Sequence, residues 1–498
     1  MSKREVNDEK KLGISPGQIP LPSPNNDLKN FRISISDNGR VNICKKAWCL
    51  RISMLVIVSF FPAYRLYQGV KFNDPFIIYS TLIPSITILI LIGSWYWYKN
   101  PAKGTTMTET DLVSVIIPIY NQKKMIKTVI DAVYRSKYRT IEVIAVNDGS
   151  IDGTKEILDD LKKRYPVLQV IHQKRGGKRK ACATGFYASK GNFIIHMDSD
   201  SVIDEDAITE IMKAFMANPK VGAVVGELRI WNANNSLLTK MQEAWHNISC
   251  NINKAYESSF GSVTCCSGPL SGFRREVISN FMPYWSDSNK LSGGGIDREL
   301  TAYVMAPKNV KKDLVQTLWT PLNLTHKLME SATHYDDADD RLLTAQSLEK
   351  WESAYVVTAT TYVEGQETWK GFIKQQTRWR KGFLRANFYL ATFFWKERHP
   401  LASVVYYLEV MAGLTIPFVI VTVLLYEPLV LEQFWLPFAF IGGIIFSAVV
   451  QGIDMKLRCP KSRIWKYMPL MSLFGTFVLS WLLFAALWNF RKNSWMTR

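Results

Sequence analysis

The sequence predicts an α/β domain with a parallel sheet, flanked on both sides by apolar helices long enough to cross a bilayer. Apolar residues concentrate at 52–98 and 401–490, whereas residues 100–400 have the mixed composition of a soluble domain. Within that domain, apolar strand patterns alternate with helical patterns, as they do in parallel sheets. With 498 residues, the chain has room for two or three structural units.

The segment ahead of the soluble region divides into a polar tail and two predicted transmembrane helices. Residues 1–47 are polar and basic and have no apolar signal segment, so we expect a disordered cytosolic tail. Residues 48–98 predict two transmembrane helices. The second, Phe76–Tyr98, is uncharged over 23 residues and ends in aromatic side chains. The first requires Arg51 and Arg65 to extend towards the membrane surface.

The loops after the soluble region predict an orientation. Apolar helices at 401–426 and 434–452 are joined by a connector without Lys or Arg, whereas the next loop, 454–466, has five basic residues. The positive-inside rule therefore places this loop, the tail and the soluble domain in the cytosol of an integral membrane protein. Glu409, an acid inside an apolar helix, either lines a channel or pairs helices. Residues 383–400, with aromatic residues among few charges, predict an interfacial helix.

The last apolar run, 467–489, is predicted to bend. A straight crossing would place the basic residues that follow outside the cell, and Pro469 and Gly475 favour a re-entrant course instead. We therefore interpret residues 401–490 as transmembrane or re-entrant channel helices, and residues 491–498 as a cytosolic segment.

Charge and cysteine content exclude other classes of protein. The formal net charge of +18 would suit nucleic acid, but the basic residues lie largely beside apolar segments or in the motifs described below, so we expect no nucleic-acid partner. The seven cysteines are scattered and form no C-x-x-C pair. The sequence therefore predicts neither a zinc site nor a disulfide framework, and the thiols are expected to be reduced and cytosolic.

Several strands of the soluble region end in polar residues. The predicted strands are Val113–Tyr120, Ile141–Val146, Leu168–His172 and Phe193–Met197. Parallel sheets bind ligands beyond the carboxyl ends of their strands. Tyr120 ends the first strand, Asp148 follows the second, and Asp198 and Asp200 follow the last. We expect these side chains to form one site.

The residue types at this edge favour a metal-bound diphosphate. Asp198 and Asp200 are separated by one small residue, and such a pair suits Mg²⁺ or Mn²⁺, whose coordination shell diphosphate oxygens complete. In most proteins an isolated pair of this kind is a solvated turn. The basic run 175–180 begins a predicted helix between two strands of the sheet, where it either cradles the same diphosphate or is a solvated charge run. Its position favours phosphate.

Further motifs follow in a specific order and spacing. They are Val-Asn-Asp-Gly-Ser around Asp148, Lys178-Arg179, Asp198-Ser199-Asp200, Val-Gly-Glu-Leu-Arg-Ile-Trp-Asn at 225–232, Ser267-Gly268-Pro269-Leu270, Ala338-Asp339-Asp340-Arg341, Gln375-Gln376-Thr377-Arg378-Trp379 and the terminal Trp495-Met496-Thr497-Arg498. With these motifs, residues 113–390 resemble the processive family 2 glycosyltransferases, and more narrowly the hyaluronan synthases. The resemblance implies a GT-A-type glycosyltransferase domain over about 105–382, embedded between the membrane helices.

The resemblance also implies roles for individual residues. On the donor side, Tyr120 and Asp148 would hold uracil, and Lys178, Arg179, Gln375 and Arg378 would contact the diphosphate together with a Mg²⁺ or Mn²⁺ ion on Asp200 and Asp198. On the acceptor side, Ser267 and Gly268 would line the site, and Trp379 would stack on the acceptor sugar. At the carboxyl end, Trp495, Thr497 and Arg498 would gate the nucleotide pocket, although Met496 replaces the glycine of the family.

The motif of the general base occurs twice. Asp340, with Asp339 and Arg341, lies at the usual distance before Gln-x-x-Arg-Trp, whereas Asp297 lies at the usual distance after Ser-Gly-Pro-Leu. The second acid beside Asp340 and its spacing to Gln-x-x-Arg-Trp together favour it as the base. Asp297 is then interpreted as a surface or structural residue of an apparent insertion at about 291–337.

The function implied by the resemblance is a processive, inverting polysaccharide synthase that works at the cytosolic face and moves its polymer across the membrane. UDP-N-acetylglucosamine and UDP-glucuronate would be the donors and the growing chain the acceptor. A chitin-type polymer, a glucose and glucuronate capsule, and a non-processive lipid-linked transferase stay open as alternatives. An inactive scaffold or a transporter conflicts with the complete set of carboxylates and basic residues.

Overall fold

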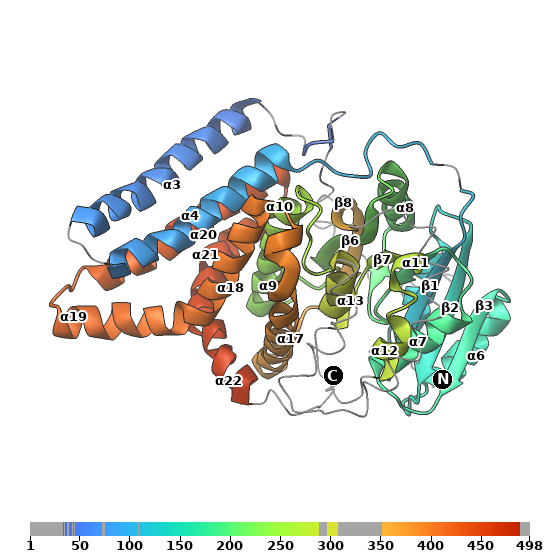
Figure 1. Ribbon diagram of the computed structural model, residues 1–498. Helices are drawn as coiled ribbons and strands as arrows, with labels where there is room; N and C mark the ends of the chain where they lie inside the picture. Colours follow the sequence, from blue (N-terminus) through green and yellow to red (C-terminus); the bar gives the residue numbers. More distant parts are fainter. Residues whose placement is uncertain are drawn as a thin grey trace, which may run out of the picture.

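The structure, a computed structural model, places an α/β domain beside a bundle of apolar helices (Figure 1). It describes short pieces between residues 33 and 43, and residues 45–71, 75–107, 109–287, 296–306 and 351–488.

The domain is built on a mixed sheet of eight strands in the order β3-β2-β1-β4-β7-β6-β8-β5. The strands are β1 Val113–Ile119, β2 Ile141–Asp148, β3 Leu168–Gln173, β4 Phe193–His196, β5 Val202–Ile203, β6 Val221–Ile230, β7 Ser271–Arg274 and β8 Glu352–Val363. The predicted parallel pairing holds for β1 to β4. It is wrong for β7, which is antiparallel to both β4 and β6. At four residues, β7 is too short to give a strand pattern.

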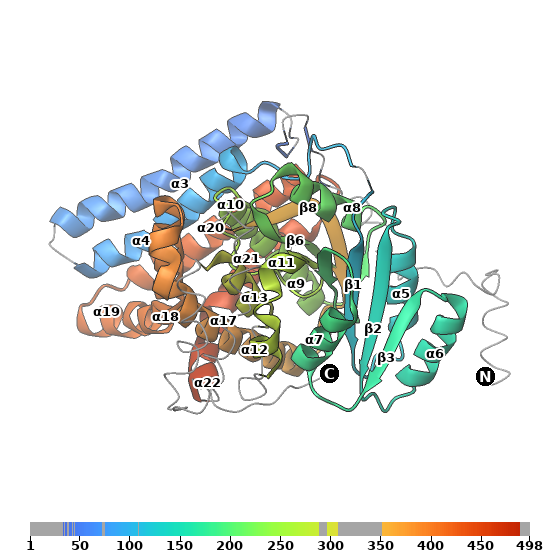
Figure 2. The same ribbon diagram turned by 45° about the vertical axis from the view of Figure 1, so that its right-hand side comes forward.

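Helices cover both faces of this sheet because its strands are apolar on both sides. They are α5 Ile126–Tyr134, α6 Thr154–Arg164, α7 Lys178–Ala188, α8 Ala207–Ala217, α9 Leu237–Ile248, η2 Ser249–Lys254, α10 Ala255–Ser258, α11 Arg275–Ile278, α12 Met282–Asp287 and α13 Ile296–Met305. Successive residues of β1 point to opposite faces, with Val115 and Ile117 in one buried core and Ile116 in the other. Helices α5 and α6 lie on one side of β1 to β3, and α7 lies on the other (Figure 2).

Helix α13, which carries Asp297, belongs to the core of the domain. Leu300 and Val304 are buried, and the Thr301 hydroxyl accepts a hydrogen bond of 2.8 Å from the backbone N–H of Cys266. Arg398 donates hydrogen bonds to the carbonyl oxygens of Met305 at 2.6 Å and Trp351 at 2.8 Å. Arg398 therefore joins the end of α13 to the residue before β8. The first part of the predicted insertion at about 291–337 thus includes a packed helix, and the insertion itself stays a prediction.

The apolar helices lie together beside the domain. They are α3 Lys45–Lys71, α4 Pro75–Ile92 with η1 Gly93–Trp97, α17 Trp369–Glu397, α18 Pro400–Val421 with η5 Thr422–Tyr426 and α19 Glu427–Val430, α20 Leu436–Arg458, η6 Ile464–Tyr467, α21 Met468–Phe477, η7 Leu479–Trp481 and α22 Leu482–Trp488. Four stretches of the described residues are long and apolar enough to cross a membrane, namely Ala47–Lys71, Pro400–Val430, Leu436–Arg458 and Ile464–Trp488. Large apolar side chains face outwards here, among them Val56 and Phe438. These features are those of a membrane protein.

Two details of the membrane helices differ from the predictions. Arg51 does not extend to the membrane surface, because it is 1% exposed and forms an ion pair of 2.5 Å with Asp454 of α20. The predicted boundary between the glycosyltransferase domain and an interfacial helix at 382–383 falls inside α17, which is continuous over 29 residues.

The last apolar run is interrupted at Val478, where α21 ends and a short 3₁₀ turn begins. A re-entrant course for this run stays a prediction.

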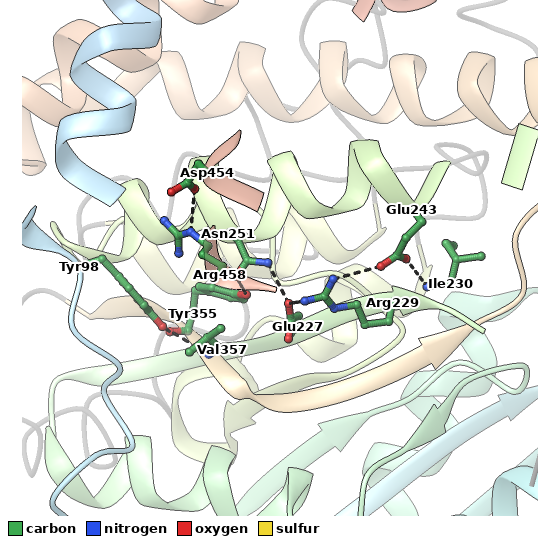
Figure 3. A network of polar contacts seen from close by, with 10 residues as sticks. All are labelled: Tyr98, Glu227, Arg229, Ile230, Glu243, Asn251, Tyr355, Val357, Asp454 and Arg458. Carbon is green, nitrogen blue, oxygen red and sulfur yellow. Dashed lines mark hydrogen bonds and ion pairs between the residues drawn. The ribbon is translucent and has the colours of Figure 1, made fainter. Parts of the chain in front are cut away.

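A buried polar network joins the domain to the bundle (Figure 3). Arg229 of β6 forms ion pairs with Glu227 at 2.5 Å and with Glu243 of α9 at 3.1 Å. Glu227 also accepts a hydrogen bond of 2.8 Å from Asn251 of η2. Desolvation raises the pKa values of both glutamates, and Arg229 opposes that rise. Figure 3 shows Arg458 at the end of α20 beside this network, so β6 and the membrane helices meet through charged groups.

Candidate active site

Three charged side chains meet at the carboxyl edge of the sheet. Lys178 is the first residue of α7, Asp198 follows β4, and Asp297 is in the first turn of α13. The Nζ atom of Lys178 lies 2.5 Å from Oδ1 of Asp198 and 3.9 Å from Oδ1 of Asp297. The interpretation of Asp297 as a surface or structural residue of an insertion is therefore wrong, because α13 brings its carboxylate to the predicted donor site.

Gly268 packs directly against this group. Its backbone N–H donates a hydrogen bond to the Asp297 carboxylate. A Cβ atom added to Gly268 would lie 2.8 Å from Nζ of Lys178 and 3.0 Å from each carboxylate oxygen of Asp297. The Ser-Gly-Pro-Leu motif thus has glycine at this position because two charged groups occupy the space of a side chain.

The protonation states of these groups depend on one another. Burial raises the pKa of the Asp297 carboxyl, Lys178 opposes that rise, and Asp198 adds to it. Burial lowers the pKa of Lys178, but Asp198 and Asp297 outweigh burial and hold the pKa above its ordinary value. Arg378 of α17 also acts electrostatically on Asp297 and lowers its pKa. The site therefore combines a fixed ammonium with a partly buried carboxylate that retains affinity for a proton.

Asp148 organises the basic loop that precedes α7. Its carboxylate is 1% exposed and accepts hydrogen bonds from the backbone N–H groups of Gly176 at 2.7 Å and Gly177 at 2.8 Å. The side chain of Gln173 donates a third bond of 2.7 Å. Gly177 has a φ of 90°, a conformation that favours glycine. Asp148 thereby fixes the loop whose next residue is Lys178.

Tyr120 supplies a planar surface at the end of β1. The guanidinium of Arg175 lies over its ring, 3.5 Å from the centroid. The next residue, Asn121, accepts a hydrogen bond of 3.0 Å from the backbone N–H of Ile151 through its side chain. The ring is therefore held beside the loop after β2, and a planar cation already stacks on it. A nucleobase requires the same kind of surface.

Arg179 does not face the donor site in the way its motif predicted. It is 5% exposed, and its Nη2 atom lies 2.5 Å from Oε2 of Glu299. This buried pair joins α7 to α13, so Arg179 holds Lys178 and Asp297 in the same neighbourhood. Glu299 lies 120 residues further along the chain than Arg179, so sequence spacing did not reveal the pair.

Aromatic side chains gather around Trp379 on α17. Its ring is 37% exposed, and it lies 6.0 Å from the ring of Trp245 and 6.1 Å from that of His246. Gln375 and Arg378 are in the same helix. Burial and the nearby Lys254 ammonium lower the pKa of His246 to about 3, so it is neutral at physiological pH. These rings form a platform of the kind that stacks on sugars.

Sequence reasoning missed three residues around this platform, namely Trp245, His246 and Lys254. The only signal was their place in the helical segment shortly before Ser-Gly-Pro-Leu. Lys254 donates a hydrogen bond of 3.0 Å to the hydroxyl of Ser267.

Some predicted residues lie outside the described part of the chain. They are Asp339, Asp340, Arg341, Trp495, Thr497 and Arg498.

The residues present fit a divalent cation with an incomplete protein shell. Asp198 and Asp200 follow β4 in one turn, and the Asp198 carboxylate is 29% exposed. Among the described residues, no group of three or more His, Cys, Asp or Glu side chains is placed to hold a metal ion. Two carboxylates suit an ion whose other ligands come from water and diphosphate. Asp198, Asp200 and Lys178 would hold that group together.

Comparison with known proteins identifies the domain. Residues 114–281 match the model of glycosyl transferase family 2. The chain is a glycosyltransferase with a family 2 catalytic domain. Its domain has the GT-A fold, with the Lys178, Asp198 and Asp297 group at the carboxyl edge of the sheet.

Individual relatives extend the comparison beyond the domain. A hyaluronan synthase of Streptococcus pyogenes serotype M3 is 26% identical over 431 residues, which are 84% of this chain and 90% of that protein. An N-acetylglucosaminyltransferase of Azorhizobium caulinodans is 30% identical over 203 residues, 39% of this chain and about half (51%) of that relative. Among solved structures, a mannosyltransferase of Pyrobaculum calidifontis in complex with GDP-Man and Mn²⁺ superposes with a TM-score of 0.49 and 16% identity, over 84% of this chain and 98% of that chain. This glycosyltransferase thus resembles hyaluronan synthases along most of its length.

Proposed function

We propose that this glycosyltransferase is a processive, inverting polysaccharide synthase that uses UDP-N-acetylglucosamine and UDP-glucuronate. Its catalytic domain would lie in the cytosol, and the membrane helices would carry the polymer outwards. The similarity to a hyaluronan synthase supports this proposal, because it extends over 84% of this chain and 90% of that protein. The observation that carries it is the meeting of Lys178, Asp198 and Asp297, on which Arg378, the residue before the exposed Trp379, acts electrostatically.

In this proposal Asp297 is the general base. Its carboxylate would take the proton of the acceptor hydroxyl as that oxygen attacks the anomeric carbon of the donor. The backbone N–H of Gly268 and the ammonium of Lys178 hold and polarise the carboxylate. A single displacement inverts the anomeric centre and gives a β-linkage. Asp340 stays a prediction as the alternative base.

The donor side separates recognition from charge stabilisation. Tyr120 would stack on uracil after Arg175 moves off the tyrosine ring. Asp148 would hold the loop that borders the uracil. Lys178 would bind the diphosphate and stabilise the negative charge that grows on the leaving UDP. A divalent cation on Asp198 and Asp200, when bound, would supply further charge stabilisation to that leaving group.

The acceptor side leads towards the membrane. Trp379 would stack on the acceptor sugar, and α17 continues from this residue to α18, which enters the bundle. A growing chain bound at Trp379 would thus start beside the helices that are proposed to carry it.

The proposal is tested by following products from the purified full-length protein in detergent. UDP release and polymer formation are measured with each donor alone and with both, and the product is treated with a hyaluronan-specific lyase. Polymer that requires both donors and is degraded by the lyase supports the proposal. Polymer from UDP-N-acetylglucosamine alone would support a chitin-type synthase, which the similarity to an N-acetylglucosaminyltransferase favours as the second candidate.

A further inference from the structure

Lys254 is a buried cation, and the described protein groups compensate its charge only in part. It ends the π-helical turn η2 and is 8% exposed. Its ammonium has three N–H donors. Ser267 accepts one of them at 3.0 Å. Within the part of the chain that the structure describes, no carboxylate forms an ion pair with this ammonium.

Glu257, an acid that Lys254 influences electrostatically, already accepts hydrogen bonds from other donors. Glu257 accepts hydrogen bonds from the hydroxyl of Thr264 at 2.7 Å and from its backbone N–H at 3.2 Å, one on each carboxylate oxygen. Lys254 acts on Glu257 only electrostatically. A buried charge without an ion-pair partner is costly to a fold, and such groups are commonly paired by a ligand.

Contacts connect Lys254 to both halves of the acceptor site. On one side it bonds Ser267, and the next residue, Gly268, donates its N–H to the Asp297 carboxylate. On the other side it acts electrostatically on His246, whose ring lies 6.1 Å from that of Trp379. The ammonium thus lies between the proposed base and the platform for the acceptor sugar. An anion bound there would belong to the acceptor, whereas the diphosphate would be bound at Lys178.

We propose that the Lys254 ammonium binds the carboxylate of a uronate residue in the acceptor chain, so that the acceptor site selects an anionic polysaccharide. This inference rests on the proposed function, because it names the class of acceptor for the same site. The neutral His246 beside the ammonium adds no competing charge and leaves the carboxylate as the matching group.

The test compares two oligosaccharides that differ only in charge. One is a tetrasaccharide of alternating N-acetylglucosamine and glucuronate, and the other is the same molecule with its carboxyl groups reduced to alcohols. Their dissociation constants are measured by calorimetry on the full-length protein in detergent, for the wild type, Lys254→Met, Lys254→Arg and Ser267→Ala. Methionine fills a buried lysine site without its charge, so the fold is expected to tolerate it. UDP binding to each variant checks that the donor site has folded.

We expect the wild type to bind the anionic tetrasaccharide at least tenfold more tightly than the neutral one. Lys254→Met should bind both tetrasaccharides with the dissociation constant that the wild type has for the neutral one. Lys254→Arg should keep the preference for the anionic tetrasaccharide. Ser267→Ala should keep it as well, because the charge remains. Three results for Lys254→Met would overturn the inference. They are equally weakened binding of both tetrasaccharides, a retained preference for the anionic one, and a loss of UDP affinity instead. These binding constants need no turnover, so they fail independently of the donor assay that tests the proposed function.

Discussion

The carboxylate of Asp297 lies 3.9 Å from the ammonium of Lys178, although 118 residues separate them in the chain. The pair forms because α7 and α13 pack on the same end of the sheet and are joined by the buried ion pair of Arg179 and Glu299. This arrangement places a carboxylate that has affinity for a proton beside a cation that would bind diphosphate. Four predictions follow from it and from the packing around it.

Replacement of Gly268 by alanine should lower kcat by roughly 100-fold, since displacement of catalytic groups by about 1 Å has that effect. The added Cβ would lie 2.8 Å from Nζ of Lys178 and 3.0 Å from the Asp297 carboxylate, so both groups must move. UDP release under saturating donor measures the effect. Gly442→Ala is the matched control, because no atom lies within 4 Å of its added Cβ. Full activity in Gly268→Ala would contradict the packing described here.

The pH dependence of transfer should reflect Asp297. A general base acts in its deprotonated form, so the rate should fall as the pH drops through its pKa. Burial raises that pKa above the ordinary value, with Lys178 in opposition. The acid limb of kcat/KM should therefore lie above the value of about 4 that is typical of an exposed aspartate. A rate that is constant down to about pH 4 would speak against Asp297 as the base.

Chelation of divalent cations should abolish UDP release, and added Mn²⁺ or Mg²⁺ should restore it. Asp200→Asn should raise the metal concentration needed for half-maximal activity by at least about tenfold, because it removes one of two carboxylate ligands. Asp160→Asn is the control, since that carboxylate is 75% exposed in a surface pair on α6. Equal metal requirements in the two variants would remove Asp200 from the proposed metal site.

Arg229→Met should destabilise the protein by about 3–5 kcal/mol, because it leaves the buried carboxylates of Glu227 and Glu243 without their cation. Thermal unfolding in detergent, followed by intrinsic fluorescence, measures the loss. Lys163→Met removes the cation of an exposed pair with Asp160, and it should cost no more than about 1 kcal/mol. Similar unfolding temperatures for the two variants would show that the network of Figure 3 contributes little to stability.

Local patterns predicted the first half of the domain well. The strands that became β1 to β4 are apolar runs that end in polar residues, and such runs are readable because burial on both faces demands them. The polar strand ends predict Asp148 and Asp198 at the carboxyl edge of the sheet, and the basic start of the next helix predicts Lys178 there. The mixed order of β7, β6 and β8 was not predictable. These strands are distant in the chain, and a segment of four residues such as β7 is too short to show a strand pattern.

The choice of the base shows the limit of spacing along the chain. Asp340 lies at the expected distance before Gln-x-x-Arg-Trp, which led to its selection over Asp297. That distance has meaning only if the intervening chain is part of the core. Arg398 donates hydrogen bonds to the carbonyl groups of both Met305 and Trp351, so it joins the end of α13 to the residue before β8. Sequence distance could not reveal this contact.

The most direct test of this account compares Asp297→Asn with Asp340→Asn in the purified full-length protein. Both variants are assayed for UDP release and for polymer with both donors, and UDP binding confirms that each has folded. Asp297→Asn should abolish transfer while it retains UDP affinity, and Asp340→Asn should leave transfer within about twofold of the wild type, because the proposal assigns the base to Asp297. Loss of transfer in Asp340→Asn with full activity in Asp297→Asn would contradict the account.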